Sequence, residues 1–173
     1  MNSNSLPHVL RFIGFLLVQV FVLQNIDFKT GVLSYVHPMI YPLFIILLPL
    51  KTPVPLITTW AFILGLMIDY FYSSFGMHAG AAVFAAYARS FVLKFMEPRG
   101  GYNVAYSPNA RRYSLRWFVR YAAFILLLHH VFYFSLQFFA PAFIVPIILN
   151  TIGSIVVSFV LVLFYQIVFD PQD

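Results

Sequence analysis

Apolar residues run along the chain in six long stretches, and each stretch ends at a short group of polar residues, glycines or prolines. A helix that crosses a bilayer needs about 20 mostly apolar residues, so stretches of this length predict membrane-spanning helices. Proline ends one helix and suits the first turn of the next, which marks the connection at Pro53 and Pro55 as a tight turn. The six predicted spans cover residues 9–25, 33–50, 54–72, 77–96, 117–139 and 143–169.

The composition supports this interpretation. Of the 173 residues, 62% are hydrophobic and only 9% are charged, whereas a soluble domain carries about 25% charged residues. The sequence therefore predicts an all-α polytopic membrane protein, with about six transmembrane helices in one bundle that takes up residues 1–173. This length leaves no room for a catalytic domain outside the bilayer. The chain has no cysteine, which excludes disulfides and thiolate chemistry.

The basic residues predict the orientation of the bundle. An even number of spans puts both termini on one side, and Lys and Arg are enriched in cytoplasmic loops. With both termini in the cytoplasm, only Lys29 lies on the far side and Arg89 lies within a span. The other basic residues then fall at or near cytoplasmic ends: Arg11, Lys51, Lys94, Arg99, Arg111, Arg112, Arg116 and Arg120. The start of the chain lacks the features of a cleaved signal peptide, so we expect the first span to be retained.

One polar connection, residues 97–116, is much longer than the others. Its arginines are Arg99, Arg111, Arg112 and Arg116. Basic residues near the surface attract anionic lipids, and they also suit a dock for a cytoplasmic protein. We expect one of these two roles for this cytoplasmic loop, and we do not expect nucleic-acid binding.

Prolines interrupt two of the predicted spans. Pro38 and Pro42 lie in the second span, and Pro141 and Pro146 lie near the start of the sixth. Broken helices in corresponding positions are typical of transporters with inverted repeats. We favour the simpler interpretation, in which these prolines end or kink helices near an interface.

Asp69 is the only acid well inside an apolar stretch, so it needs a reason to be there. Thr58, Phe62, Gly65 and Asp69 share one face of the third span, and Gly65 would let another backbone approach closely. The short turn that follows makes the third and fourth spans antiparallel neighbours. We therefore expect Asp69 to lie near His78 and to be able to pair with it.

The fourth span is the least hydrophobic and is rich in alanine. His78 and Arg89 lie on nearly the same face of this helix, about 16 Å apart along its axis, so a direct bond between Asp69 and Arg89 is not expected. Small residues between them suit close helix packing. The candidate partner or packing site is made of Gly65, Asp69, Gly76, His78, Gly80 and Arg89.

Three interpretations of this cluster remain open: a structural polar knot between two helices, a binding site for a partner helix or small ligand, and a catalytic or proton-relay site. Nothing in the sequence supplies a pair of carboxylates or a set of metal ligands, so no catalytic, cofactor or metal site is assigned. Two further polar stripes are predicted to be packing surfaces rather than metal sites. They consist of His130, Tyr133 and Gln137, and of Thr151, Ser154 and Ser158.

The sequence from Gly65 to Asp69, followed by Gly76, His78 and Gly80 and an alanine-rich helix, resembles the MreD family of bacterial rod shape-determining proteins. The resemblance implies a non-enzymatic inner-membrane subunit of the cell-elongation machinery, which makes peptidoglycan. It implies as partners a single-span MreC-like protein, the MreB filament, and RodA with its transpeptidase. It also implies a six-helix bundle similar to the substrate-binding subunits of energy-coupling-factor transporters, and no cofactor. The long basic loop and the proline-rich second span depart from the family.

Three functions follow from these observations. The first is a membrane scaffold that recognises partner helices within the bilayer. The second is the substrate-binding subunit of a transporter for a small molecule such as a vitamin, which would enclose its ligand near the outer side. The third and weakest is a lipid-modifying enzyme that uses His78 and Asp69.

Overall fold

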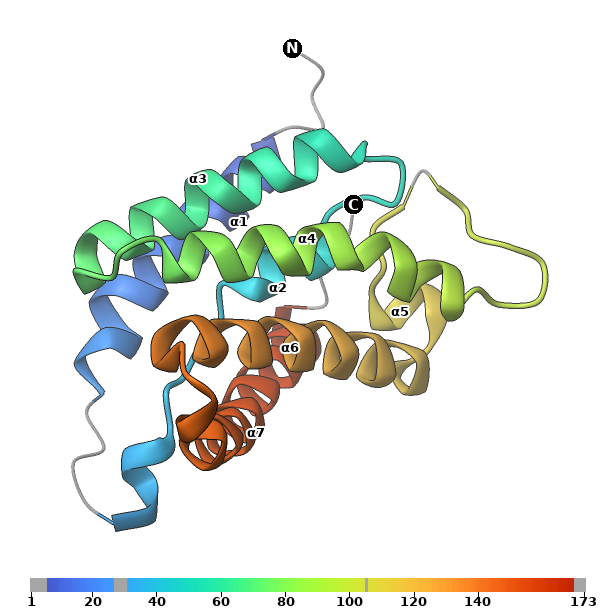
Figure 1. The fold of residues 1–173 in the computed structure, drawn as a ribbon. Coiled ribbons are helices and arrows are strands. Elements are labelled where there is room, and N and C mark those ends of the chain that lie inside the picture. Colours follow the sequence, from blue (N-terminus) through green and yellow to red (C-terminus); the bar gives the residue numbers. More distant parts are fainter. Residues whose placement is uncertain (1–5, 27–30, 105, 170–173) are drawn as a thin grey trace.

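The computed structural model describes residues 6–26, 31–104 and 106–169, and every regular element within them is a helix (Figure 1). In chain order these elements are α1 (Leu6–Leu17), η1 (Val18–Val22), η2 (Leu23–Asn25), η3 (Gly31–Tyr35), α2 (Pro42–Leu47), α3 (Val54–Tyr72), α4 (Met77–Phe95), α5 (Ala110–Tyr113), α6 (Leu115–Phe138), η4 (Pro141–Phe143) and α7 (Ile144–Phe169). Four helical runs are long and apolar enough to cross a membrane: Leu6–Asn25, α3, α6 and α7. The described chain is therefore all-helical, and its four long apolar runs fit a membrane protein.

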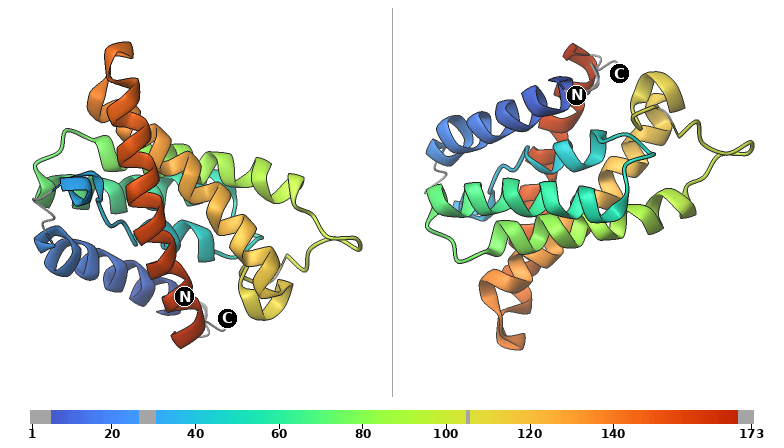
Figure 2. Two further views of the ribbon diagram at one scale, coloured as in Figure 1. Left: turned by 90° about the horizontal axis from the view of Figure 1, so that it is seen from below. Right: turned by 90° about the horizontal axis from the view of Figure 1, so that it is seen from above.

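The helix α4 lies at the centre of the bundle, between α3 and α6 (Figures 1 and 2). It has 19 residues, but its alanines, Gly80 and charged groups make it less apolar than the four runs that could cross a membrane. Its alanines face inward, and Ala81, Ala82, Ala85 and Ala86 are fully buried. Small buried side chains let neighbouring helices approach closely, which is the role that the sequence predicts for this helix.

The first turn of α1 and the last turn of α7 lie at the same end of the bundle (Figure 2). The two helices are in contact near this end, since the ring centroids of Phe15 and Tyr165 are 5.0 Å apart. The short helix α5 and the basic loop lie toward this end as well (Figure 2). We call it the basic end, and we call the end that holds the turn between α3 and α4 the opposite end.

The second predicted span is not a continuous helix. Its backbone forms η3, then runs without helical structure over residues 36–40, and becomes α-helical only in the six residues of α2. The prolines explain the break. Pro38 has no N–H to donate, Pro42 begins α2, and Leu48 is extended ahead of Pro49, as residues before proline tend to be. Irregular backbone at membrane depth is tolerated where protein covers it, and Tyr41, Leu43, Ile45, Ile46 and Leu47 are almost completely buried.

The outer face of α7 is apolar and exposed. Ile152, Val156, Val160, Phe164 and Ile167 follow one another along this helix, and each is 58–66% exposed. A water-soluble protein rarely exposes such a continuous apolar stripe. This surface is therefore suited to contact with lipid.

Candidate functional site

Side chains from α7 and the first helical run satisfy the unpaired backbone of residues 36–40. The N–H groups of His37 and Met39 donate to the hydroxyl oxygens of Ser154 and Ser158, both at 2.9 Å. On the other side, Ile40 N–H donates to Gln19 Oε1 at 2.9 Å, while Gln19 Nε2 donates to Pro38 O at 3.1 Å. The Gln19 amide thus pairs with the chain as a neighbouring strand would. Buried backbone groups need such partners, because an unpaired one costs about 1–3 kcal/mol.

The segment can reach α7 because Gly153 has no side chain. A Cβ at this position would lie 2.8 Å from Tyr35 O, which is closer than packed atoms come. One turn further on, the Ser158 hydroxyl also lies 3.1 Å from His130 Nε2, and the ring of His130 is bonded through Nδ1 to Leu126 O. The predicted packing stripe on α7 is therefore a contact surface, but its partner is extended chain as well as a helix.

Residues 31–50 cross the bundle with an irregular backbone, and we call them the irregular crossing. Arg89 binds backbone near the C-terminal end of this crossing. Its guanidinium donates through Nη2 to Leu48 O and through Nε to the Tyr121 hydroxyl, which lies 2.9 Å away. Tyr121 in turn donates to Ile46 O at 3.2 Å. The last carbonyls of a helix lack partners and attract positive charge, so Arg89 and Tyr121 stabilise the end of α2. As predicted, Arg89 makes no bond with Asp69.

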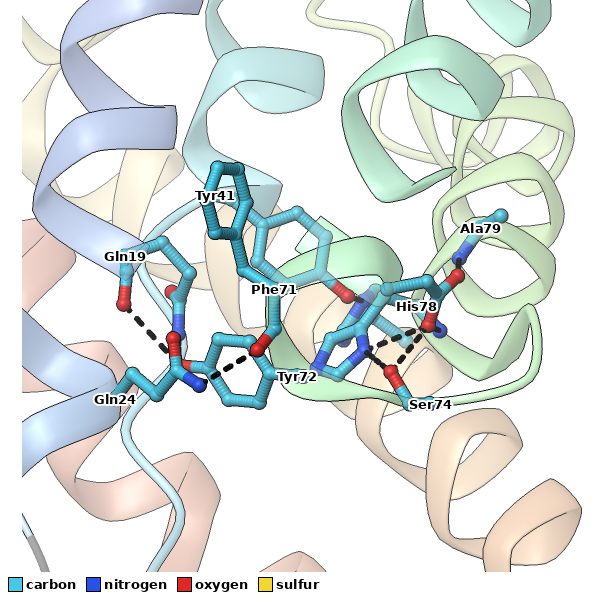
Figure 3. A network of polar contacts seen from close by, with 10 residues as sticks. Gln19, Gln24, Tyr41, Phe71, Tyr72, Ser74, His78 and Ala79 are labelled. Carbon is cyan, nitrogen blue, oxygen red and sulfur yellow. Dashed lines mark hydrogen bonds and ion pairs between the residues drawn. The ribbon is translucent and has the colours of Figure 1, made fainter. Parts of the chain in front are cut away.

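Asp69 binds the start of α4 rather than lying free for another chain, and its partners Ser74, His78 and Ala79 are labelled in Figure 3. Its Oδ1 accepts from His78 N–H at 3.0 Å and from the Ser74 hydroxyl at 2.6 Å, and its Oδ2 accepts from Ala79 N–H at 2.9 Å. The His78 ring lies beside it, with Nδ1 3.0 Å from Oδ1. The predicted pairing of Asp69 with His78 is confirmed. The carboxylate supplies acceptors to N–H groups that a helix start leaves unpaired.

Gly65 lies one turn before Asp69, where α3 touches the start of α4. A Cβ at Gly65 would lie 2.4 Å from the Cα of Ala79 and 2.6 Å from its nitrogen, so no side chain fits between the two helices. The two backbones therefore meet directly, and this contact brings Asp69 within reach of α4. The predicted close approach at Gly65 is confirmed, and its partner is α4 of the same chain.

Three tyrosine rings surround the buried ring of His78. The centroids of Tyr133, Tyr72 and Tyr41 lie 4.7, 4.8 and 5.8 Å from the His78 ring. The second ring nitrogen of His78 is fully buried and has no hydrogen-bond partner among the described residues. Figure 3 shows this nitrogen on the side of Tyr72, away from Ser74. Beyond Tyr41, whose hydroxyl lies 2.6 Å from His129 Nε2, the polar groups continue into α6.

The basic loop is folded onto the end of the bundle. Leu50 N–H and Lys51 N–H donate to the carbonyls of Tyr106 and Val104 at 3.1 and 2.9 Å. The Tyr102 hydroxyl donates to Leu93 O at 2.8 Å, and burial raises the pKa of this hydroxyl to about 12. The four arginines of the predicted loop surface are all exposed: Arg99, Arg111, Arg112 and Arg116. Arg112 also lies 3.8 Å above the ring of Tyr106.

An open apolar groove runs along α4 between α3 and α6, with a volume of about 1040 Å³. Its floor is α4, which contributes small residues as well as Met77, Phe84 and Tyr87, and side chains from the two neighbouring helices form its walls. The floor includes Gly76, Ala79, Gly80 and Val83, and the walls include Phe62, Leu66, Phe132 and Leu136. The wall residues Phe62 and Leu66 are about half exposed, so the groove opens onto the surface that would face lipid.

The six residues of the candidate partner or packing site thus separate into three groups. Gly65, Asp69 and His78 join α3 to α4. Gly76 has a positive φ of 81° at the start of α4, and together with Gly80 it lines the groove. Arg89 belongs to the irregular crossing. The sequence does not reveal that Gln19 pairs with the backbone of residues 38–40. Its only signal there is an amide side chain within the first apolar stretch.

No protein-family model, curated protein or solved structure matches the chain. Within the part of the chain that the structure describes, no three His, Cys, Asp or Glu side chains lie together in a way that could hold a metal ion. The interpretation of the site therefore rests on its geometry. Most of the buried polar residues complete the fold of this chain, and the groove along α4 offers an open surface.

Proposed function

We propose that the protein is a non-enzymatic scaffold subunit of the bacterial cell-elongation machinery, and that it acts by holding a partner helix within the inner membrane. The observation that carries this proposal is the apolar groove along α4, whose floor includes the small residues Gly76, Ala79 and Gly80. Without a hydrophobic driving force in lipid, helices associate through close packing, and small residues allow their backbones to approach.

The intramolecular bonds of Asp69 and Arg89 support this role. They fix α3, α4 and α2 relative to one another, so the floor and walls of the groove are rigid before a partner arrives. A preformed surface loses little conformational freedom on binding, which favours affinity. Asp69 then acts by shaping the surface and not by touching the partner.

The identity of the machinery rests on the resemblance of residues 65–80 to the MreD family. In this proposal, the groove takes the membrane helix of the single-span MreC-like protein. The basic end then lies in the cytoplasm with both termini, on the side of the MreB filament, and RodA and its transpeptidase act in the same assembly. Positive residues favour that side, and the exposed Arg99, Arg111, Arg112 and Arg116 are concentrated there.

Site-specific crosslinking in cells tests the proposal. A photoreactive phenylalanine analogue is placed at Phe62, a wall of the groove, and at Phe164 on α7 as the matched control, since 48% and 60% of these side chains are exposed. We expect the probe at Phe62 to capture the MreC-like protein, identified by mass spectrometry, and the probe at Phe164 to capture lipid. Equal capture of this partner from both positions, or from neither, would contradict the proposal.

A second variant fills the groove. Val83→Trp places a large ring on the floor, whereas Val156→Trp adds the same ring to the exposed face of α7. At equal membrane levels, we expect Val83→Trp cells to lose their rod shape and Val156→Trp cells to keep it. Rod-shaped cells with both variants would argue against a partner in the groove.

A further inference from the structure

A second, more polar cavity lies near the opposite end, with a volume of about 160 Å³. Its walls come from the first helical run, from the extended segment over residues 36–40, from α6, and from Tyr72 at the end of α3. Gln24, Ile26 and His37 are exposed and surround its mouth, while Gln19, Pro38 and Met39 are buried deeper. The irregular crossing therefore creates this cavity, since a regular helix over residues 33–50 would not leave this backbone beside Gln19.

Tyr133 borders the cavity from α6 and is only 7% exposed. None of the described residues makes a hydrogen bond to its hydroxyl, whereas the nearby Tyr72 hydroxyl is bonded twice to Gln19, at 2.7 and 3.1 Å. A buried tyrosine usually finds a partner for its hydroxyl. The Tyr133 hydroxyl, which no described residue bonds, is not among the fully buried unpaired atoms of the described chain, so it opens to the cavity and can bond a molecule bound there.

The chemistry of the lining favours a cation. The described residues around the cavity include no Lys or Arg that could bind a phosphate or carboxylate. They offer oxygen atoms at Gln24, Pro38 and Tyr133, and the faces of two tyrosine rings attract positive charge. The carboxylate of Asp69 lies just behind them, since it bonds His78, whose ring centroid is 4.7 Å from that of Tyr133.

The volume of the cavity and its depth below the end of α6 limit the kind of ligand further. A volume of 160 Å³ corresponds to about five water molecules, so the part of a ligand that enters the cavity is a small group of a few non-hydrogen atoms. Tyr133 lies five residues before the end of α6, which is about 7.5 Å along the helix axis. Because α6 is about 36 Å long and the hydrocarbon core of a bilayer is about 30 Å thick, this depth lies a few ångströms inside the boundary between headgroups and acyl chains.

We propose that this cavity binds a primary ammonium group, presented by the headgroup of an aminophospholipid or by a free small amine. The ammonium donates to the Tyr133 hydroxyl and to the carbonyl oxygens at the cavity, and the tyrosine rings enclose it. This site is separate from the groove along α4, so it does not depend on the proposed partner.

Lipid titration followed by native mass spectrometry tests this site. Purified full-length protein in detergent is titrated with phosphatidylethanolamine, with its N-acetylated form, which has lost the positive charge, and with phosphatidylglycerol. We expect phosphatidylethanolamine to bind roughly tenfold more tightly than either of the others, as for a desolvated cation with charge-assisted hydrogen bonds. Equal affinity for all three lipids would overturn the proposal.

The variant Tyr133→Phe removes only the unpaired hydroxyl. We expect it to weaken binding of phosphatidylethanolamine roughly three- to tenfold, as for one lost hydrogen bond, and to leave phosphatidylglycerol binding unchanged. Tyr70→Phe is the matched control, because Tyr70 is 82% exposed and does not border the cavity. A full preference in Tyr133→Phe, or the same loss in Tyr70→Phe, would contradict the assignment.

Ethanolammonium chloride distinguishes the two sources of the amine. If millimolar ethanolammonium displaces phosphatidylethanolamine from the wild type but has no effect on phosphatidylglycerol, the site accepts a free amine. If it displaces neither lipid while the preference for phosphatidylethanolamine remains, the site requires the lipid. Both results support an ammonium site, whereas a wild type that shows no preference for phosphatidylethanolamine overturns it.

Discussion

Two parts of this bundle meet the demands of the bilayer in different ways. The pair of helices α3 and α4 is regular, and it is held by direct backbone contact at Gly65 and by the Asp69 carboxylate at the start of α4. The crossing over residues 31–50 is irregular, and side chains of Gln19, Ser154 and Ser158 supply the hydrogen bonds that its backbone cannot make internally. In both parts, backbone groups that water cannot reach need hydrogen-bond partners, and this need explains two different sets of buried polar residues.

The comparison teaches that a charged or polar residue within a span need not be a binding site. Among the described residues, Asp69 and Arg89 are the buried acid and the buried arginine, and each is bonded to backbone of its own chain. Leaving a buried backbone group unpaired in lipid costs several kcal/mol, which is enough to retain such residues for folding alone. A function is therefore better sought at surfaces that these bonds leave open.

The largest expected effect is at the contact between α3 and α4. Gly65→Ala would place a Cβ 2.4 Å from the Cα of Ala79, and backbone cannot move aside as a side chain can. We expect a loss of about 3 kcal/mol or more in the free energy of unfolding, measured by titration with sodium dodecyl sulfate in mixed micelles. Gly14→Ala is the matched control, because nothing lies within 4 Å of the added Cβ, and it should change stability little.

Removal of the Asp69 carboxylate should have the next largest effect. Asp69→Ala leaves the N–H groups of His78 and Ala79 without their acceptor, so we expect a loss of about 2–4 kcal/mol in the same titration. Asp69→Asn keeps one acceptor oxygen and should lose less than Asp69→Ala. Equal losses in the two variants would show that hydrogen bonding at the start of α4 is not what Asp69 contributes.

Gln19→Leu tests the irregular crossing, with a smaller expected loss of about 1–3 kcal/mol. The change keeps the size of the side chain but leaves Ile40 N–H and Pro38 O unpaired. Gln24→Leu is the control, since the Gln24 side chain is exposed and bonds only Phe71 O. If both variants lose the same stability, the pairing between Gln19 and the extended segment is not important for folding.

The smallest expected effect on stability comes from Tyr102 at the basic end, because its side chain is only partly buried. Burial raises the pKa of the Tyr102 hydroxyl from 10.0 to about 12. Because the unfolded chain ionises first, the contribution of Tyr102 to stability is complete below pH 10 and is lost as the pH rises through 12. The difference in absorbance at 295 nm between wild type and Tyr102→Phe should report ionisation near pH 12. Ionisation near pH 10 would mean that the loop does not pack against Leu93.

Much of this fold follows from the sequence. The apolar stretches predict the spanning helices α3, α6 and α7, because length and composition decide whether a helix can cross lipid. The pairing of Asp69 with His78 is also predictable, since a short turn between antiparallel helices brings their ends together. These are local inferences, in which the residues that interact lie close in the chain.

The irregular crossing is harder to predict, because it depends on residues far apart in the sequence. Pro38 and Pro42 indicate a break, but they do not show that the chain runs extended against α7. That arrangement needs Gly153, Ser154 and Ser158, more than a hundred residues later, and their pattern is equally typical of helix packing. The polar cavity beside Gln19 follows from the same long-range contacts, so sequence reasoning misses it too.

Hydrogen exchange of the amides of His37, Met39 and Ile40 in lipid bilayers tests most directly whether the buried polar side chains hold an irregular crossing. The geometry predicts slow exchange at all three amides, close to that of α4. It also predicts that Ser158→Ala speeds exchange at Met39 while leaving Ile40, which is bonded to Gln19, protected. Fast exchange of all three amides in the wild type, or slow exchange at Met39 in Ser158→Ala, would contradict the account.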